Sequence, residues 1–148
     1  RTTILVGFPG ETDEDFEELK QFVKDIKFDR LGCFVFSPEE GTKAYSMSDI
    51  PSEEISLKRY NEIMQIQKEI AYQQNKKRIN QKYDVLIENI SDDGLFFLGR
   101  SYGEAPGIDP VIHVLAQQDN IKIGDIVKVK ILDVDEYDLT GVSINECS

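Results

Sequence analysis

The sequence predicts a two-part chain, with an α/β segment and a long closing helix in residues 1–80 and a small five-stranded all-β barrel in residues 81–148. Apolar residues of the first part form continuous runs or recur at helical spacing, whereas from Tyr83 onward they alternate with polar residues. The charge also changes along the chain. Residues 1–80 carry 12 basic and 15 acidic side chains (net −3), whereas residues 81–148 carry 5 and 13 (net −8).

Local signals mark the first strand and the first helix. The apolar run of residues 2–8 ends at residues 7–10 (Gly-Phe-Pro-Gly), which is a turn sequence. Thr12 then has the position of a helix N-cap, with Asp15 three residues later as its capping-box partner. The buried face of this helix is predicted from residues at helical spacing, namely Phe16, Leu19, Val23 and Ile26.

A second strand is predicted at residues 31–36 (LGCFVF), where successive positions are apolar. That pattern is typical of a strand covered on both faces, as in a parallel sheet, so strand, helix and strand form a right-handed βαβ unit. Two such strands do not make a sheet that is stable without further strands and covering helices. We therefore expect residues 1–50 to be the last part of a larger α/β domain.

A long helix is predicted after Pro51, with Ser52 as its N-cap. Its apolar stripe is predicted to consist of Leu57, Tyr60, Met64, Ile70 and Ala71. The stripe fades into the polar residues 73–78, and we interpret the basic side chains there as compensation of the helix dipole rather than as a nucleic-acid site.

The second part is predicted to contain five short strands and no helix. Alternation places Val127, Val129 and Ile131 on a buried face and Lys128 and Lys130 on a wet one. Residues 92–94 (Asp-Asp-Gly) and 122–125 (Lys-Ile-Gly-Asp) are turn sequences. The strands are expected at residues 83–90, 95–100, 111–115, 126–134 and 139–144. Short strands at this density favour a closed barrel related to the OB fold.

Composition indicates a globular chain in a reducing, cytoplasmic setting. No apolar run is long enough to span a bilayer. Cys33 and Cys147 lack metal or disulfide spacing, and His113 has no nearby ligand set, so no metal site is predicted. The acidic charge of residues 81–148 has two interpretations of equal weight, attraction of a basic partner and simple solubility.

Several segments are together characteristic of one enzyme family. Residues 1–12 (RTTILVGFPGET) and 36–44 (FSPEEGTKA) resemble the late strands of the catalytic barrel of the radical S-adenosylmethionine methylthiotransferases. The C-terminal stretch is similar to a TRAM domain. Within it, residues 99–102 (GRSY), 104–109 (EAPGID) and 135–139 (DEYDL) resemble the branch that modifies ribosomal protein S-twelve. The resemblance implies the terminal βαβ part of a TIM-like radical SAM barrel followed by a TRAM domain.

The resemblance also implies an activity, cofactors and a partner. Enzymes of this branch attach a methylthio group to the β-carbon of an aspartate, an unactivated position that requires S-adenosylmethionine and two 4Fe-4S clusters. The chain has no CxxxCxxC arrangement, so we expect it to ligate neither cluster, to contain no catalytic residue and to be inactive alone. The expected partner is the basic ribosomal protein. The alternatives are a tRNA-modifying methylthiotransferase with an RNA-binding TRAM domain, and a non-enzymatic interaction protein.

Residues near the cofactor and the substrate follow from the same resemblance. The cofactor-binding candidates are Leu5, Gly7, Glu11 and Phe36. The alternative for these is an ordinary βα turn and core packing. The substrate-binding candidates are Arg100, Tyr102, Glu104, Ile108 and Asp109. The alternative for Arg100 is pairing with a carboxylate of its own domain, and for residues 105–109 a rigid proline turn.

Two further clusters of charged residues are candidates for binding, one basic and one acidic. An RNA-binding strip would use the basic residues Lys76, Lys77, Arg78, Lys82, Lys128 and Lys130. The acidic cluster of residues 133–136 lacks the spacing of a calcium loop, so a solvated turn or a contact for a basic protein is expected there.

Overall fold

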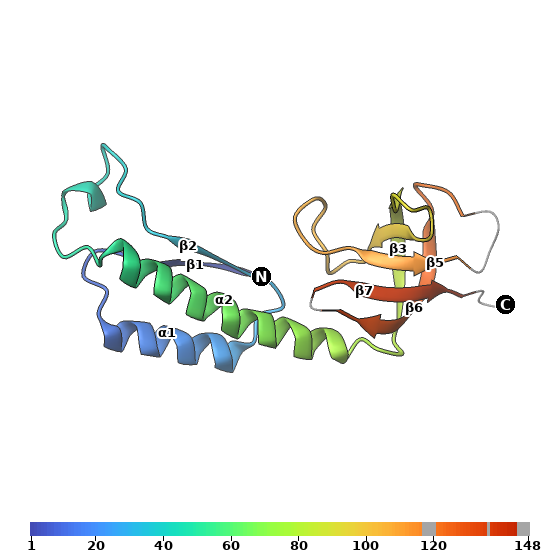
Figure 1. The fold of residues 1–148 in the computed structure, drawn as a ribbon, viewed down its shortest axis with the longest axis horizontal. Coiled ribbons are helices and arrows are strands. Elements are labelled where there is room, and N and C mark those ends of the chain that lie inside the picture. Colours follow the sequence, from blue (N-terminus) through green and yellow to red (C-terminus); the bar gives the residue numbers. More distant parts are fainter. Residues whose placement is uncertain (117–120, 136, 145–148) are drawn as a thin grey trace. The chain divides into compact units, whose positions relative to one another are not determined.

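The computed structural model describes residues 1–116, 121–135 and 137–144 (Figure 1). The chain forms two compact units, Arg1–Ala71 and Tyr72–Ser148. The division falls inside the long helix α2 (Glu53–Lys76). None of the helices in the described ranges is long and apolar enough to cross a membrane.

The first unit is built on a parallel pair of strands, β1 (Thr2–Val6) and β2 (Leu31–Val35), connected by helix α1 (Asp13–Ile26) (Figure 1). A short 3₁₀ turn, η1 (Ala44–Ser46), precedes α2. One face of the pair packs against both helices, and the core consists of Ile4, Val6, Phe16, Val23, Leu31, Cys33 and Ile63. The predicted βαβ unit is therefore confirmed, with a sheet that is covered on one face.

Helix α1 begins as its sequence predicts. The Thr12 hydroxyl accepts a hydrogen bond from the Asp15 amide at 3.1 Å, and the Asp15 carboxylate accepts one from the Thr12 amide at 3.0 Å. Phe16 and Val23 are buried, but Ile26 is 53% exposed, contrary to the prediction. Ile26 is the last helical residue, and the chain turns away at Lys27, whose φ of +55° is left-handed.

Helix α2 begins at Glu53, where the Ser52 hydroxyl accepts a hydrogen bond from the Ile55 amide at 3.3 Å. The predicted apolar stripe is partly wrong, because Leu57 is 52% exposed. The side chains that are buried along this helix are Ser56, Arg59, Ile63, Gln67, Ala71 and Asn75. Most of these buried residues are polar. The spacing of apolar residues therefore predicts side chains at the edge of the buried face and misses those at its centre.

The second unit is the predicted barrel. Its strands close in the order β3-β4-β5-β7-β6, and only the β5–β7 pair is parallel (Figure 1). The strands are β3 (Lys82–Ile90), β4 (Phe97–Arg100), β5 (Ile112–Leu115), β6 (Ile126–Val134) and β7 (Leu139–Ser143). Its core consists of Val85, Ile87, Ile112, Val114, Val129, Ile131 and Leu139. The hairpin turn at residues 91–96 is confirmed by the Ser91 amide, which donates to the Phe96 carbonyl at 2.9 Å.

Candidate functional site

The turn between β1 and α1 (residues 7–11) contains two of the predicted cofactor-binding residues, Gly7 and Glu11. Gly7 has a φ of +77°, and a Cβ atom at this position would lie 2.3 Å from the Ser56 hydroxyl, so the turn requires glycine. The Gly7 amide donates to Glu11 Oε2 at 2.9 Å, and the Glu11 amide donates to the Phe8 carbonyl at 3.0 Å. The turn is thus held by one hydrogen bond to the Glu11 carboxylate and one between backbone groups.

Arg59 of α2 holds this turn in place. Its Nη1 donates to Glu11 Oε1 at 2.6 Å and to the Glu11 carbonyl at 3.2 Å, and its Nη2 donates to Asp13 Oδ1 at 2.8 Å. Arg59 is only 5% exposed, and its guanidinium lies 5.4 Å from the centre of the Phe16 ring. Although burial acts to lower it, the hydrogen bonds to Asp13 and Glu11 hold the pKa of Arg59 above its ordinary value. With both carboxylate oxygens of Glu11 engaged, its role here is to hold the turn.

Leu5 and Phe36, the other two cofactor-binding candidates, are at the same end of the strand pair. Leu5 is 47% exposed on the sheet face opposite the helices, and its register partner Phe34 is 60% exposed. Phe36 follows β2, where its amide donates to the Val6 carbonyl at 2.8 Å and its ring meets Phe8 edge-on at 5.3 Å. The carboxyl ends of the two strands therefore present an open apolar face beside a fixed glycine turn.

The loop between β4 and β5 contains the substrate-binding candidates and forms two consecutive turns. In the Tyr102 turn (residues 101–104), the amide and hydroxyl of Ser101 donate to Glu104 Oε2 at 2.9 and 2.6 Å. In the Ile108 turn (residues 105–109), the Ala105 amide donates to Asp109 Oδ2 at 2.6 Å, and the Asp109 amide donates to the Ala105 carbonyl at 3.2 Å. Both acidic candidates therefore fasten the loop from within.

Glu104 is bound to a basic side chain of its own chain. Arg78 Nη1 donates to Glu104 Oε1 at 2.6 Å and Arg78 Nη2 donates to the Ser101 hydroxyl at 3.0 Å. The Glu104 side chain is 2% exposed. Burial acts to raise the pKa of Glu104, but the hydrogen bonds from Arg78 and Ser101 hold it below its ordinary value. The carboxylate is thus ionised, internal and fully partnered.

Two of the remaining candidates, Tyr102 and Ile108, face solvent. Tyr102 is 93% exposed and Ile108 is 79% exposed, each at the outer side of its turn. Arg100 Nε donates to Glu88 Oε1 at 2.8 Å across the β3–β4 pair, so Arg100 has the internal partner that the alternative interpretation expected.

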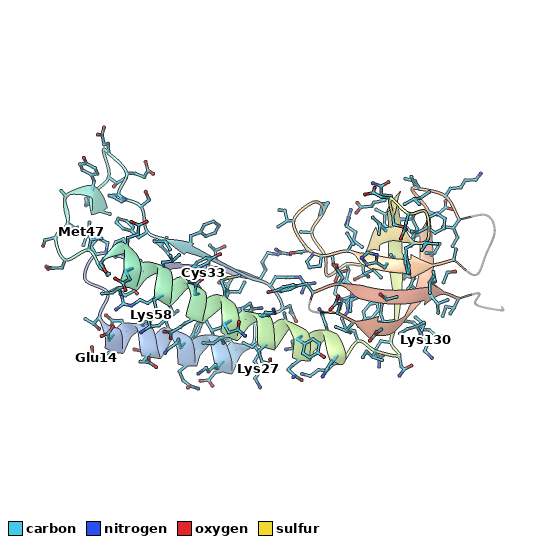
Figure 2. The ribbon with its side chains drawn as sticks, in the orientation of Figure 1. Glu14, Lys27, Cys33, Met47, Lys58 and Lys130 are labelled. Carbon is cyan, nitrogen blue, oxygen red and sulfur yellow. The ribbon has the colours of Figure 1, made fainter. Side chains whose placement is uncertain are left out.

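The basic strip considered for RNA is interrupted by pairing within the chain. Arg78 is bound to Glu104, and Lys128 lies 2.8 Å from Asp84. Lys82 lies opposite Lys130 in the β3–β6 register. Figure 2, which labels Lys130, draws these side chains on the ribbon.

His113 and Cys33 are two other side chains that could bind a metal or react, and both contact residues of their own unit. His113 Nε2 lies 3.7 Å from Asp138 Oδ2, and its ring meets Phe96 edge-on at 5.7 Å. Burial raises the pKa of the Cys33 thiol, labelled in Figure 2, to about 11. Across the described ranges, no group of three His, Cys, Asp or Glu side chains is placed to hold a metal ion. Cys147 and Glu136 lie outside those ranges.

Comparison with known proteins covers both units. Residues 79–144 match the family described as TRAM domain. The whole chain is 45% identical over 148 residues to the ribosomal protein uS12 methylthiotransferase RimO of Acetivibrio thermocellus. It is 49% identical over 146 residues, or 99% of the chain, to the RimO protein of Clostridium kluyveri. It is 50% identical over 141 residues, or 95% of the chain, to that of Thermoanaerobacter sp. strain X514.

The chain is thus similar, over nearly its whole length, to one part of proteins named RimO. It spans about a third of the length of these curated relatives, since the match covers 32% of each. The TRAM match includes the barrel strands and the loop that contains Tyr102 and Ile108. The first unit lies outside the TRAM match and inside the matches to the RimO proteins.

Sequence reasoning missed Arg59 and Ser56 in the first unit and the role of Arg78 in the second. Arg59 lies between the predicted stripe residues Leu57 and Tyr60, next to the exposed Lys58, so its position in the sequence does not distinguish it from a solvated basic residue. Arg78 was grouped with the solvated end of the helix, and its lysine neighbours gave no signal that it differs from them.

Proposed function

We propose that the chain is the C-terminal portion of a radical S-adenosylmethionine methylthiotransferase that modifies the β-carbon of an aspartate in ribosomal protein uS12. The observation that carries this proposal is the identity of 45–50% to proteins named RimO, which extends over nearly the whole chain rather than over the TRAM segment alone. The tRNA-modifying alternative has no comparable support, because the names of these relatives specify the ribosomal protein.

In this proposal the first unit is the end of the catalytic barrel. Parallel strands in such barrels present their active sites at the carboxyl ends, which is where residues 7–11 and Phe36 lie. Leu5 and Phe34 suit a face that further strands and their side chains complete.

Gly7, Leu5 and Phe36 are proposed as one wall of the S-adenosylmethionine site. Gly7 is buried against Ser56 and places the carboxyl end of β1 beside two apolar side chains, which fits a ligand that has an aromatic part. Glu11 is proposed to act through the turn, because Arg59 and the Gly7 amide already engage its carboxylate. When bound at this wall, S-adenosylmethionine would supply the radical chemistry that an unactivated C–H bond requires.

The clusters do not fit the residues of this chain. The sequence has two cysteines, and the thiol of Cys33 is buried with a raised pKa, whereas cluster ligands are thiolates. We therefore propose that the cluster ligands lie in other parts of the enzyme and that this chain alone does not catalyse the reaction.

The TRAM domain is proposed to dock the basic ribosomal protein in the cytoplasm. Its net charge of −8 over residues 81–148 attracts a basic partner and repels an RNA backbone. Arg100, Tyr102, Ile108 and Asp109 are proposed to lie on the docking surface, with Glu104 holding the loop beneath them.

A chimeric enzyme tests the proposed function. The last third of the Acetivibrio thermocellus RimO protein is replaced by this chain, and purified uS12 is analysed by mass spectrometry for a methylthio group on aspartate. We expect modification that depends on S-adenosylmethionine. A matched chimera containing the corresponding segment of the Clostridium kluyveri protein controls for the junction. If that control is active while the chimera with this chain is not, or if the chimera modifies tRNA instead, the proposal is wrong.

A further inference from the structure

Two tyrosine rings lie next to each other where the Tyr102 turn meets β3. The ring centres of Tyr83 and Tyr102 are 6.4 Å apart with an interplanar angle of 33°. Tyr83 packs against the barrel core, and the Arg78 guanidinium lies 4.5 Å from its ring centre. Tyr102 is 93% exposed, so its ring is available to a partner.

The turn that presents Tyr102 is fixed from inside the domain. Ser101, on one side of Tyr102, and Glu104, on the other, are both bound to Arg78. The segment around Arg78 is itself hydrogen-bonded to the barrel, because the Asn80 amide donates to the Ile131 carbonyl at 2.9 Å. A large aromatic side chain on an immobile turn loses little further entropy on binding, which is a property of good contact residues.

The net charge of residues 81–148 as a whole indicates the kind of partner. A nucleic-acid base that stacks on tyrosine brings phosphates with it, and these need free basic side chains nearby. Here Arg78 is paired with Glu104, Lys128 is paired with Asp84, and residues 81–148 have a net charge of −8. A cation has the opposite preference, since both the acidic domain and the electron-rich ring face attract it.

We propose that Tyr102, supported by Tyr83 and presented by the Arg78–Glu104 pair, is the receptor for a cationic side chain, arginine in preference to lysine, in a basic segment of the partner protein. This inference rests on the proposed function and specifies its docking contact. Arginine is preferred because its planar guanidinium stacks on an aromatic face while keeping its hydrogen-bond donors free for carboxylates. Ile108, 79% exposed on the next turn, offers apolar surface to the aliphatic part of such a segment.

A labelled peptide of alternating arginine and serine is the probe, and its binding to the 148-residue chain is followed by fluorescence anisotropy. We expect Tyr102→Leu, which keeps apolar bulk but removes the ring, to weaken binding roughly 3- to 10-fold. Tyr102→Phe keeps the ring and should stay within about twofold of the unsubstituted chain. Leu95→Ala is the matched control, because Leu95 is 67% exposed in a different loop, and it should leave the affinity unchanged.

A second peptide, with citrulline in place of arginine, separates the charge from the shape. Citrulline is nearly isosteric with arginine but neutral, so we expect the difference between the unsubstituted chain and Tyr102→Leu to disappear. If the difference persists with citrulline, the ring is only an apolar contact and the inference is wrong. The inference is also wrong if the chain binds oligouridylate more tightly than the arginine peptide and Tyr102→Leu abolishes that binding.

The inference and the proposed function can be disproved independently of each other. A chimera that modifies uS12 together with peptide binding that ignores Tyr102 overturns only the inference. Tyr102-dependent peptide binding together with an inactive chimera overturns only the proposed function.

Discussion

The two units of the chain differ in how their sheets end. In Arg1–Ala71 the sheet has two strands. On the face opposite the helices, Leu5 is 47% exposed and Phe34 is 60% exposed. In Tyr72–Ser148 five strands close on themselves, and the apolar side chains of the core are 2% exposed or less. A closed barrel satisfies its own strand edges, whereas an open parallel pair does not. We therefore expect the second unit to be structurally self-contained and the first to require covering.

Both units nevertheless use an arginine and a glutamate to fix a turn. In the first unit Arg59 and Glu11 hold the turn after β1, in which Gly7 is buried against Ser56. In the second unit Arg78 and Glu104 hold the turn after β4, which presents the side chain of Tyr102. The same kind of ion pair thus supports a turn packed closely against a helix in one unit and a turn that displays an exposed aromatic side chain in the other.

The largest expected effect separates the two units. We predict that residues 72–148 expressed alone fold cooperatively, because their barrel is closed, and that residues 1–71 alone aggregate or remain unfolded, because two strands with an apolar face uncovered are insufficient. Circular dichroism during thermal unfolding and size-exclusion chromatography measure this. A cooperative, monomeric transition for residues 1–71 would show that the first unit does not need covering.

The next effect concerns the ion pair inside the second unit. We predict that Arg78→Met lowers the free energy of unfolding of residues 72–148 by about 3–5 kcal/mol, because it leaves the Glu104 carboxylate buried without its guanidinium. Arg100→Ala is the matched control, since its pair with Glu88 is partly exposed and is worth about 1 kcal/mol or less. Urea titration measures both variants. Equal losses would mean that burial does not distinguish the two pairs.

A smaller effect is expected in the first unit. We predict that Gly7→Ala in the active chimera lowers stability by about 1–3 kcal/mol, through a strained φ and a clash with Ser56. Gly10→Ala is the control, because Gly10 has a similar φ of +84° but no atom within 4 Å of an added Cβ, so it incurs only the backbone strain. Thermal unfolding of the two variants measures the difference, which isolates the contribution of the contact with Ser56.

Local sequence patterns predict contacts between residues that are close in the sequence, but not the long-range ion pairs of this chain. The Thr12 capping box and the alternation in β6 join residues close in sequence, and both were predictable. Arg59 and Glu11 are 48 residues apart, and Arg78 and Glu104 are 26 apart, so no local pattern links them. The buried face of α2 was missed for a related reason, because polar side chains on it have partners that are distant in the sequence. Gln67, for example, donates to the Phe28 carbonyl at 2.9 Å. Glu104 is a substrate-binding candidate from the family resemblance, which does not reveal that its carboxylate is buried.

The smallest expected effect is a change in the pH dependence of the second unit. The pKa of Glu104 is lowered in the folded state, so the unfolded chain binds this proton more readily. Its contribution to stability is therefore complete above the ordinary glutamate pKa of about 4.5 and is lost as the pH falls through the lower folded value. We predict that Glu104→Gln, which removes the titrating group, makes the unfolding free energy of residues 72–148 less dependent on pH below 4.5 than it is in the unsubstituted unit. Urea titrations over a series of acidic buffers measure the two slopes. Parallel slopes would mean that Glu104 takes up its proton equally in the folded and unfolded states, and that Arg78 does not hold it ionised.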